Sequence, residues 1–320
     1  MNLQIKGVKS KKGWGMLCGV LAAVCYGTNP LGALKLYAEG MSTGSVLFYR
    51  FGLAWLIVGI VLLLRRETFR VSLRELRVLL GLGLLFTVSS LTLYLSFHLM
   101  DAGVASTILF TYPVMTAVIM ALFFHERMNA VTISAIVLSF IGVALLYRGD
   151  GHTVLPWGGV VLVLLSALTY AVYIIVVNSS KLQLSSFKIN FYVLLCCAIG
   201  MLVYSLLSGE RIILPPTPTS WFYVVWLATV PAIMALVLLV YAARYAGSTT
   251  TAILGALEPL TAVLIGIGVF GEQFTGWLAA GIALILAAVT MVVLGKKDNT
   301  TQTSPKKGET PSPQSPHTSA

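Results

Sequence analysis

Ten runs of mostly apolar residues, each about as long as a bilayer is thick, follow one another along this chain. A helix needs roughly 20 such residues to cross the hydrocarbon core of a membrane. The runs cover residues 14–34, 45–64, 76–99, 103–124, 129–147, 157–177, 187–207, 221–243, 248–269 and 275–294. Because a backbone in lipid must satisfy its own hydrogen bonds, each run is expected to be a helix. The sequence therefore predicts an all-α integral membrane protein with ten transmembrane helices.

The composition agrees with a membrane protein and argues against other classes. Of 320 residues, 58% are hydrophobic and only 10% are charged, whereas soluble domains carry roughly 25% charged residues. The net charge of +10 does not indicate nucleic acid, because the basic residues flank the apolar runs. The four cysteines lie within apolar runs without C-x-x-C spacing, which favours packing roles: Cys18, Cys25, Cys196 and Cys197. We expect no metal and no cofactor.

The lysines and arginines predict the orientation of the chain. With the N-terminus inside, 17 of them fall in inside segments, and 3 fall outside. Such a bias sets topology, so both termini are expected on the cytoplasmic side of the inner (plasma) membrane. Residues 1–13 form a basic cytoplasmic N-terminus. Residues 295–320 are polar and rich in Pro, Ser and Thr, which predicts a disordered cytoplasmic tail.

The two halves of the chain resemble each other. The segment "TYPVMTAVIMALFFHER" (111–127) aligns with "LEPLTAVLIGIGVFGEQ" (257–273), and in each the proline and the last glutamate stand 13 residues apart. The offset covers five predicted spans, and five is odd, so the second copy enters the membrane from the opposite side. This predicts two inverted five-helix repeats, 14–147 and 157–294, which are typical of transporters that work by alternating access. An ancestral duplication with only structural meaning is the alternative.

A family resemblance lies in the segments "FYRFGLAWLIV" (48–58), 111–146 and 257–294. With these segments the chain resembles the EamA-type permeases of the ten-helix drug/metabolite transporter superfamily. In that family the fourth and ninth helices end in Gly-Glu, whereas here the first copy reads "HE". The glycines of the following helices are divided between the copies, as Gly142 and Gly281. These departures leave the family unchanged but blur the subfamily.

The resemblance implies export of amino acids or related metabolites through a central cavity. We therefore expect a secondary active exporter of small metabolites that works by alternating access, with proton coupling as one option. A facilitative carrier for sugars or other metabolites is the alternative. A membrane enzyme or a scaffold is least favoured, because no nucleophile, acid and base converge and no nucleotide-binding loop occurs. The expected partners are a small-molecule substrate, the bilayer and a candidate proton, without nucleic acid, and the protein is expected to be a monomer.

Pro113 and Pro259 lie inside predicted spans and predict bends, since proline removes a backbone donor and clashes with the carbonyl four residues earlier. The bends either gate the path or only shape the bundle. Glu258 is an acidic residue deep within a span, where an ionised carboxylate is unfavourable by about 2.5–3.5 kcal/mol. Three roles stay open for it: proton coupling, substrate binding through an ammonium group, or local satisfaction at the proline bend. Its counterpart in the first half is Tyr112.

Four polar or aromatic residues complete the predicted substrate site: Tyr26, Asn29, Tyr94 and Tyr170. Polar groups within spans face the bundle interior, and ligand sites combine apolar walls with few directed polar groups. Hydrogen bonding between helices is the alternative for each. Arg50 lies near the start of the second predicted span. This place favours an arginine that extends to the membrane interface over one that binds a substrate carboxylate. His98, Glu126 and Glu272 lie at span ends and favour structural roles.

Overall fold

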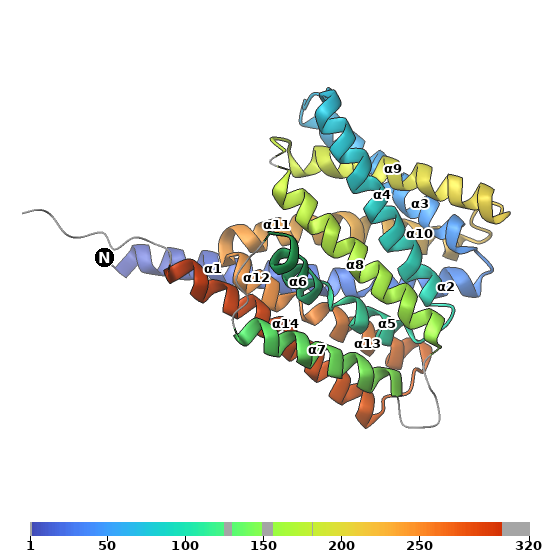
Figure 1. The fold of residues 1–320 in the computed structure, drawn as a ribbon. Coiled ribbons are helices and arrows are strands. Elements are labelled where there is room, and N and C mark those ends of the chain that lie inside the picture. The colour runs from blue at the N-terminus through green and yellow to red at the C-terminus, as the bar shows by residue number, and fades with distance from the viewer. Residues whose placement is uncertain (1, 125–129, 149–155, 181, 303–320) are drawn as a thin grey trace, which may run out of the picture.

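The structure is a computed structural model that describes residues 2–124, 130–148, 156–180 and 182–302, all of them helix, turn or loop. The helices of the first half are α1 (Asn2–Gly27), α2 (Asn29–Ala38), α3 (Thr43–Leu64), α4 (Leu73–Ser96), α5 (Ala102–Leu109), α6 (Tyr112–Phe124) and α7 (Ala130–Arg148). The helices of the second half are α8 (Trp157–Ser179), α9 (Ser186–Ser208), α10 (Pro218–Thr229), the π-helix η1 (Val230–Met234), α11 (Ala235–Ala246), α12 (Ser248–Leu254), α13 (Leu257–Phe270) and α14 (Gly276–Gln302). Together they form one helical bundle (Figure 1).

The described helices follow the predicted spans. Seven helical segments are long and apolar enough to cross a membrane, and three shorter apolar helices, Ile133–Leu146, Leu257–Phe270 and Gly276–Met291, lie in the other three predicted spans. The all-helical fold is confirmed for the described residues, while the count of ten spans stays a prediction. Two ends differ from expectation, because α1 already begins at Asn2 and α14 continues to Gln302. The predicted disorder of the tail concerns mainly residues 303–320, which lie outside the described residues.

Three of the predicted spans are broken rather than bent. The breaks fall at Thr28, at Phe110–Thr111 and at Gly255–Ala256. A proline follows each break within the first turn of the next helix, at Pro30, Pro113 and Pro259. In a first turn the missing N–H has no partner to lose, so proline is well tolerated there. The predicted mid-helix bends at Pro113 and Pro259 are therefore helix restarts, and the third restart, at Pro30, was not predicted.

Corresponding helices of the two halves have corresponding neighbours in the other half. α1 packs on α11, and α8 packs on α4. α1 and α8 lie in the first predicted spans of their halves, whereas α4 and α11 lie in the third. Corresponding spans also contact each other directly: α3 with α9, α5 with α13 and α7 with α14. Two halves related by a pseudo-twofold axis are expected to give this contact pattern, and the axis itself stays a prediction. The opposite orientation of the halves across a bilayer remains a prediction.

The glycines divided between the two copies meet where α7 crosses α14. A Cβ atom at Gly142 would lie 3.1 Å from the carbonyl oxygen of Gly281, and a Cβ atom at Gly281 would lie 3.1 Å from that of Gly142. A Cβ at Gly281 would also lie 2.7 Å from Leu146. Small residues allow such close approach of helix backbones in membranes, so this pair sets the α7–α14 distance.

Replacing Gly281 by leucine is expected to lower the Tm, because the added side chain has no space between α7 and α14. Overpacking a tight contact destabilises by about 1–3 kcal/mol. Thermal unfolding in detergent measures the effect. The matched control is Gly81→Leu on α4, where a Cβ would meet nothing within 4 Å. Equal Tm values for the two variants would contradict the tight crossing.

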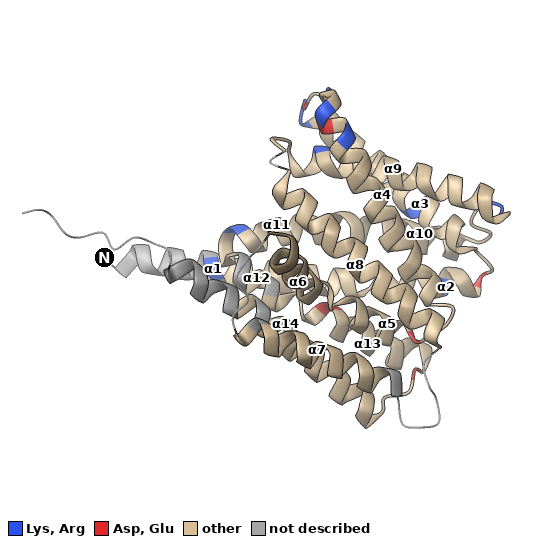
Figure 2. Cartoon of the chain, viewed as in Figure 1, with Lys and Arg blue, Asp and Glu red and all other residues tan. Residues whose placement is uncertain are grey.

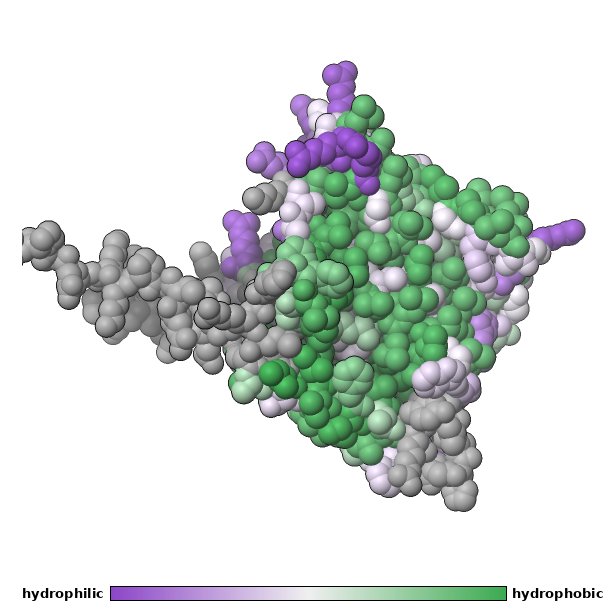
Figure 3. Space-filling view, viewed as in Figure 1, coloured by the Kyte–Doolittle hydropathy of each residue, from purple (hydrophilic) through white to green (hydrophobic). Residues whose placement is uncertain are grey.

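The surface of the bundle fits a membrane. Lys, Arg, Asp and Glu lie mostly at the ends of helices, with uncharged ribbon between them (Figure 2). The face shown in Figure 3 is a broad hydrophobic area with hydrophilic residues at its margins. Large apolar side chains are exposed along the helices, such as Leu63 on α3, Phe140 on α7 and Leu207 on α9. Exposed apolar surface of this extent indicates contact with lipid.

Candidate functional site

A cavity of about 440 Å³ lies in the centre of the bundle, where the three helix breaks meet. The residues beside the breaks, Asn29, Phe110 and Gly255, all line it. Its remaining lining residues are Gly19, Ala23, Tyr26, Arg50, Phe86, Ser89, Ser90, Leu93, Tyr94, Leu109, Tyr112, Pro113, Tyr170, Leu239, Ala243, Thr251, Glu258, Val289 and Val293. The wall is mainly apolar and aromatic with a few polar groups, which is the composition of a small-molecule site.

All five residues predicted for the substrate site lie in the wall of this one cavity: Tyr26, Asn29, Tyr94, Tyr170 and Glu258. Pro113 also lines it, whereas Pro259 is buried behind Glu258 in the first turn of α13. Tyr112, the counterpart of Glu258 in the first half, lies in the same wall. Residues from five of the predicted spans are thus brought together at one cavity.

The helix break before α13 places Glu258 at the cavity. The carbonyl of Gly255, which Pro259 deprives of its usual partner, accepts a hydrogen bond from the Glu258 N–H at 2.9 Å. The end of α1 comes very close, since a Cβ atom at Gly27 would lie 2.6 Å from the Glu258 carbonyl oxygen. Only glycine permits this approach. Gly27 therefore holds the neighbouring Tyr26 and Asn29 beside Glu258.

Arg50 is part of the same cavity, and its predicted position at the membrane interface is wrong. Its side chain is 7% exposed, which is incompatible with a snorkelling arginine. Nη1 of Arg50 donates to the hydroxyl of Tyr94 at 2.6 Å. The guanidinium also lies 5.4 Å from the ring centres of Phe51 and Tyr94. Aromatic faces on both flanks stabilise a cation away from water.

A chain of hydrogen bonds fixes Arg50 to the first helix break. The Tyr94 hydroxyl donates to Oδ1 of Asn29 at 3.4 Å, and Nδ2 of Asn29 donates to the carbonyl of Tyr26 at 2.9 Å. These hydrogen bonds orient the side chains of Arg50, Tyr94 and Asn29 relative to one another. The Nε atom of Arg50 is buried and has no hydrogen-bond partner. One donor of the guanidinium is thus left without an acceptor inside the protein.

The cavity holds one acidic and one basic side chain, Glu258 and Arg50. Within the described part of the chain, neither has an ion-pair partner, and the one pair found joins Arg65 and Glu67. Unpaired charges within a membrane are costly and usually belong to a functional site. The arrangement offers one group to an anion and one to a cation within the same cavity.

One end of the bundle is closed above the cavity by hydrogen bonds between helices. The Tyr37 hydroxyl donates to the Tyr94 carbonyl at 3.1 Å and lies 3.1 Å from Oγ1 of Thr43. Thr43 bonds Nε2 of His98 at 3.0 Å, and the His98 ring stacks on Tyr37 at 4.1 Å. His98 is therefore structural, as expected. The cavity wall instead continues toward the other end, through Gly19 on α1 and Ala243 on α11.

Glu272 ties the two halves together at the closed end. Its carboxylate accepts hydrogen bonds from the N–H groups of Ala102 at 2.9 Å and Gly103 at 3.3 Å, at the start of α5. Carboxylates are favourable at helix N-termini. Burial, followed by the charge of Asp101, raises the pKa of Glu272 above its ordinary value. This is the structural role expected for Glu272, while the predicted role of Glu126 lies outside the described residues.

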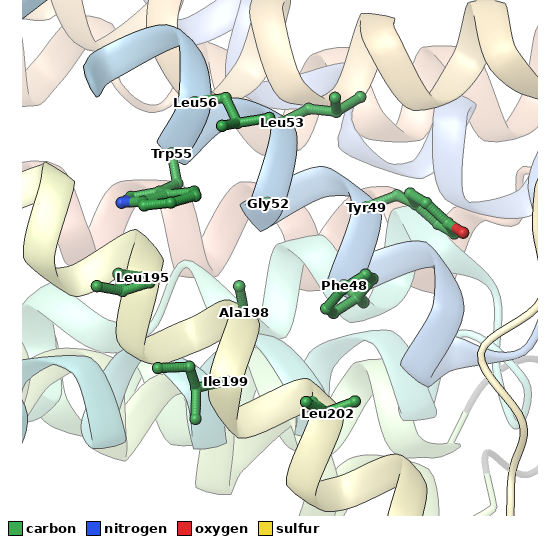
Figure 4. A pocket seen from close by; sticks show the side chains of 10 residues that line it. All are labelled: Phe48, Tyr49, Gly52, Leu53, Trp55, Leu56, Leu195, Ala198, Ile199 and Leu202. Carbon is green, nitrogen blue, oxygen red and sulfur yellow. The ribbon is translucent and has the colours of Figure 1, made fainter. Parts of the chain in front are cut away.

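A second cavity, of about 390 Å³, lies between α3 and α9. Figure 4 shows its ten lining residues, which are glycine or carry apolar or aromatic side chains, such as Phe48, Trp55, Leu195 and Leu202. Two of them, Leu56 and Ile199, are about half exposed at 52% each. No charged side chain of the described residues lines this cavity, and its polar side-chain groups are the Tyr49 hydroxyl and the Trp55 indole N–H, so it offers fewer polar groups than the central cavity. The central cavity is therefore the candidate site.

The sequence pattern of the EamA-like transporter family matches this chain twice, over residues 13–148 and residues 157–294. An "Uncharacterized transporter" of Archaeoglobus fulgidus is 28% identical over 213 residues, which cover 67% of this chain and 75% of that protein. The "Uncharacterized inner membrane transporter YedA" of Escherichia coli K12 is 26% identical over 252 residues, covering 77% of this chain and 81% of that protein.

A solved structure described as "Crystal structure of protein" has a similar fold. The TM-score is 0.65 with 17% sequence identity, and the match covers 90% of this chain and 99% of the other. At this identity the likeness concerns the fold alone. It extends over nearly all of the helices described above.

Proposed function

Because this chain belongs to the EamA-like transporter family, we propose that it is a secondary active exporter of small zwitterionic metabolites, most favourably amino acids or related compounds. The observation that carries the proposal is the pair of unpaired opposite charges, Arg50 and Glu258, in one cavity. A zwitterion satisfies both at once: its carboxylate pairs with Arg50, and its ammonium group pairs with Glu258. Arginine suits a carboxylate because its planar N–H groups bind both oxygens.

The cavity walls support a small substrate with an apolar or aromatic side chain. Tyr112 and Tyr170 stand edge to face at 4.8 Å, and Tyr170 is stacked with Tyr173 at 5.9 Å. The volume of about 440 Å³ suits a single small molecule. Tyr26, Asn29 and Tyr94 add hydroxyl and amide groups that orient the ligand between the two charges.

The transport cycle we propose is alternating access in the inner membrane. The matched contacts between the halves support it, because two halves related by a twofold axis can exchange conformations. In the predicted orientation the closed end faces outward, and the cavity wall extends toward the cytoplasm. Substrate enters from the cytoplasm, and the exchange of conformations releases it outside. The contact of Glu272 with α5 must then break.

A facilitative carrier for sugars is the second candidate. The observation that favours it is the number of hydroxyl groups in the wall, from Ser89, Ser90 and the tyrosines Tyr26, Tyr94, Tyr112 and Tyr170. Hydroxyl groups of a sugar match such a lining. Arg50 and Glu258 would then hold no charged partner, which makes this candidate the weaker one.

Counterflow in liposomes tests the proposal. Purified protein is reconstituted, loaded with unlabelled solute and supplied with labelled amino acids or labelled sugars outside. We expect saturable exchange of one or more amino acids, and weaker exchange when either the carboxylate or the amine of that amino acid is blocked. Exchange of sugars alone would favour the facilitative carrier. No exchange of any solute, together with chemical turnover of a lipid, would overturn the transporter proposal.

A further inference from the structure

A basic loop joins α3 to α4, away from the central cavity. Five arginines lie within residues 65–77, all of them exposed: Arg65, Arg66, Arg70, Arg74 and Arg77. Lys188, at the start of α9, packs against the same loop. These six basic side chains face two carboxylates, Glu67 and Glu75, so the local net charge is +4. Figure 2 shows the blue residues gathered at this tip, and Figure 3 shows the same tip as hydrophilic above a hydrophobic surface.

Both carboxylates of the loop are occupied by local partners. Glu67 accepts from the Ser185 hydroxyl at 2.5 Å and lies 3.8 Å from Nη1 of Arg65. Glu75 caps its own helix by accepting from the Ser72 N–H at 2.7 Å. In the part of the chain that the structure describes, no carboxylate pairs with Arg66, Arg70 or Arg74. Their charges are available to an external anion.

The loop is held in place by its contacts with α9. Nζ of Lys188 donates to the Arg70 carbonyl at 2.5 Å, and the Tyr192 hydroxyl donates to the Phe69 carbonyl. The Phe69 ring packs edge to face on Phe191 at 5.1 Å. The arginines therefore extend from an anchored backbone, which reduces the conformational entropy lost when an anion binds.

Arg66 occupies a backbone position that normally belongs to glycine. It follows the end of α3 with a φ of 55°. The N–H of Arg66 donates to the Leu63 carbonyl at 3.0 Å, and the N–H of Glu67 donates to the Leu62 carbonyl at 3.1 Å. These bonds define a left-handed helix ending, in which glycine is favoured because it has no Cβ. An arginine is strained there, and strain of this kind tends to accumulate at functional positions.

Exposed leucines place the loop at the membrane surface. Leu63 and Leu64 immediately precede it with 64% and 79% exposure, and Leu73 follows it with 79%. Such side chains favour lipid tails, so the arginines between them stand at the level of the headgroups. Lys and Arg in this position attract anionic lipids.

We propose that the loop of residues 65–77 is a binding site for an anionic phospholipid headgroup, with Arg66 and Arg70 as its main ligands. The guanidinium groups bind the phosphate through paired N–H donors, which a lysine would not provide in the same geometry. The site is separate from the central cavity and does not depend on what that cavity transports.

Thermal unfolding in mixed micelles tests the site. The protein is compared in dioleoyl phosphatidylglycerol, which is anionic, and in dioleoyl phosphatidylcholine, which is zwitterionic. A ligand that binds only the folded protein raises its Tm, so we expect a Tm several degrees higher in phosphatidylglycerol. Arg66→Gly is expected to raise the Tm in phosphatidylcholine, because it relieves backbone strain, and to reduce the gain from phosphatidylglycerol by about half. Arg70→Gln is expected to reduce the gain without changing the Tm in phosphatidylcholine.

Two controls distinguish a defined headgroup site from diffuse charge attraction and from binding of free phosphate. Arg244→Gln removes one exposed charge from the end of α11 and is expected to keep the full gain. Inorganic phosphate in phosphatidylcholine micelles is expected to give no gain. The proposal is overturned if Arg244→Gln lowers the gain as much as Arg70→Gln, since the attraction is then diffuse. It is also overturned if phosphate alone reproduces the gain, or if Arg66→Gly and Arg70→Gln keep the gain of the native protein.

Discussion

Replacing Arg50 by glutamine is expected to weaken substrate binding by roughly 30-fold or more, corresponding to about 2 kcal/mol or more for the loss of a desolvated charge pair. Nη1 of Arg50 is held at 2.6 Å by Tyr94, and Nε has no partner within the protein. Binding of a carboxylate would use the free donor and neutralise the charge. Counterflow in liposomes over a range of solute concentrations measures the loss as a raised KM.

The same substitution separates a binding role from a structural role. Burying an unpaired charge is unfavourable, so Arg50→Gln is expected to keep or raise the Tm of the empty protein. Arg50→Lys keeps the charge but loses the planar donor pair, and an intermediate KM is expected. The matched control is Arg211→Gln, which removes an exposed arginine outside the cavity. An unchanged KM in Arg50→Gln, or a Tm that falls with the activity, would contradict a direct role in binding.

The sequence was sufficient to predict the helices and much of the candidate site. Apolar length predicted where the helices lie, and the rule that polar groups in lipid face the interior placed Tyr26, Asn29, Tyr94, Tyr170 and Glu258 in one cavity. That rule works because a membrane offers no other place for such groups. It needs no knowledge of which helices are neighbours.

Arg50 shows where this reasoning fails. The distance from the start of the predicted span at residue 45 predicts a position for Arg50 near the membrane interface. The helix in fact begins at Thr43, and Tyr37, Thr43 and His98 close the bundle above it. Burial here is produced by tertiary contacts of α2 and α4. The number of residues between Arg50 and the start of its span does not show which other helices cover it.

The prolines illustrate a second limit. Proline in an apolar run was interpreted as a bend, yet the chain restarts a helix at Pro30, Pro113 and Pro259. In both a bend and a restart, proline lacks the N–H that would bond the carbonyl four residues earlier. The presence of proline alone therefore does not distinguish a bend from a restart. The restarts have a consequence for the site, since each places a residue of the break in the cavity wall: Asn29, Phe110 and Gly255. Pro30 was missed because it lies near the end of the first predicted span.

The two halves differ at one pair of corresponding cavity residues, and this difference concerns the proposed coupling of transport to protons. Tyr112 and Glu258 occupy corresponding positions and line the same cavity, but only Glu258 can exchange a proton with water as a carboxylate. In the transport cycle we propose, a cavity with one acidic residue would provide a single proton site per cycle. We propose that the matching elements of the two halves serve the conformational exchange and that Glu258 links this exchange to a proton gradient.

Replacing Glu258 by glutamine is therefore expected to abolish transport driven by a pH gradient while sparing exchange. Glutamine keeps the shape and hydrogen-bonding capacity of a protonated carboxyl but cannot release a proton. In liposomes with an imposed gradient, net uptake of labelled amino acid by Glu258→Gln should fall at least tenfold, to the rate seen without a gradient. Counterflow at equal pH on both sides should continue with a raised KM, because the ammonium group of the substrate loses its charged partner.

Two comparisons make the outcome decisive. Tyr112→Phe alters the corresponding position without removing an acid, so its response to the gradient should match that of the native protein. Glu272→Gln removes a carboxylate at the closed end and should alter the rate of exchange rather than its dependence on the gradient. If Glu258→Gln still accumulates substrate in proportion to the gradient, the proton uses another route. If it loses counterflow as well, Glu258 is needed for binding or for conformational exchange itself, which contradicts the expectation that exchange is spared.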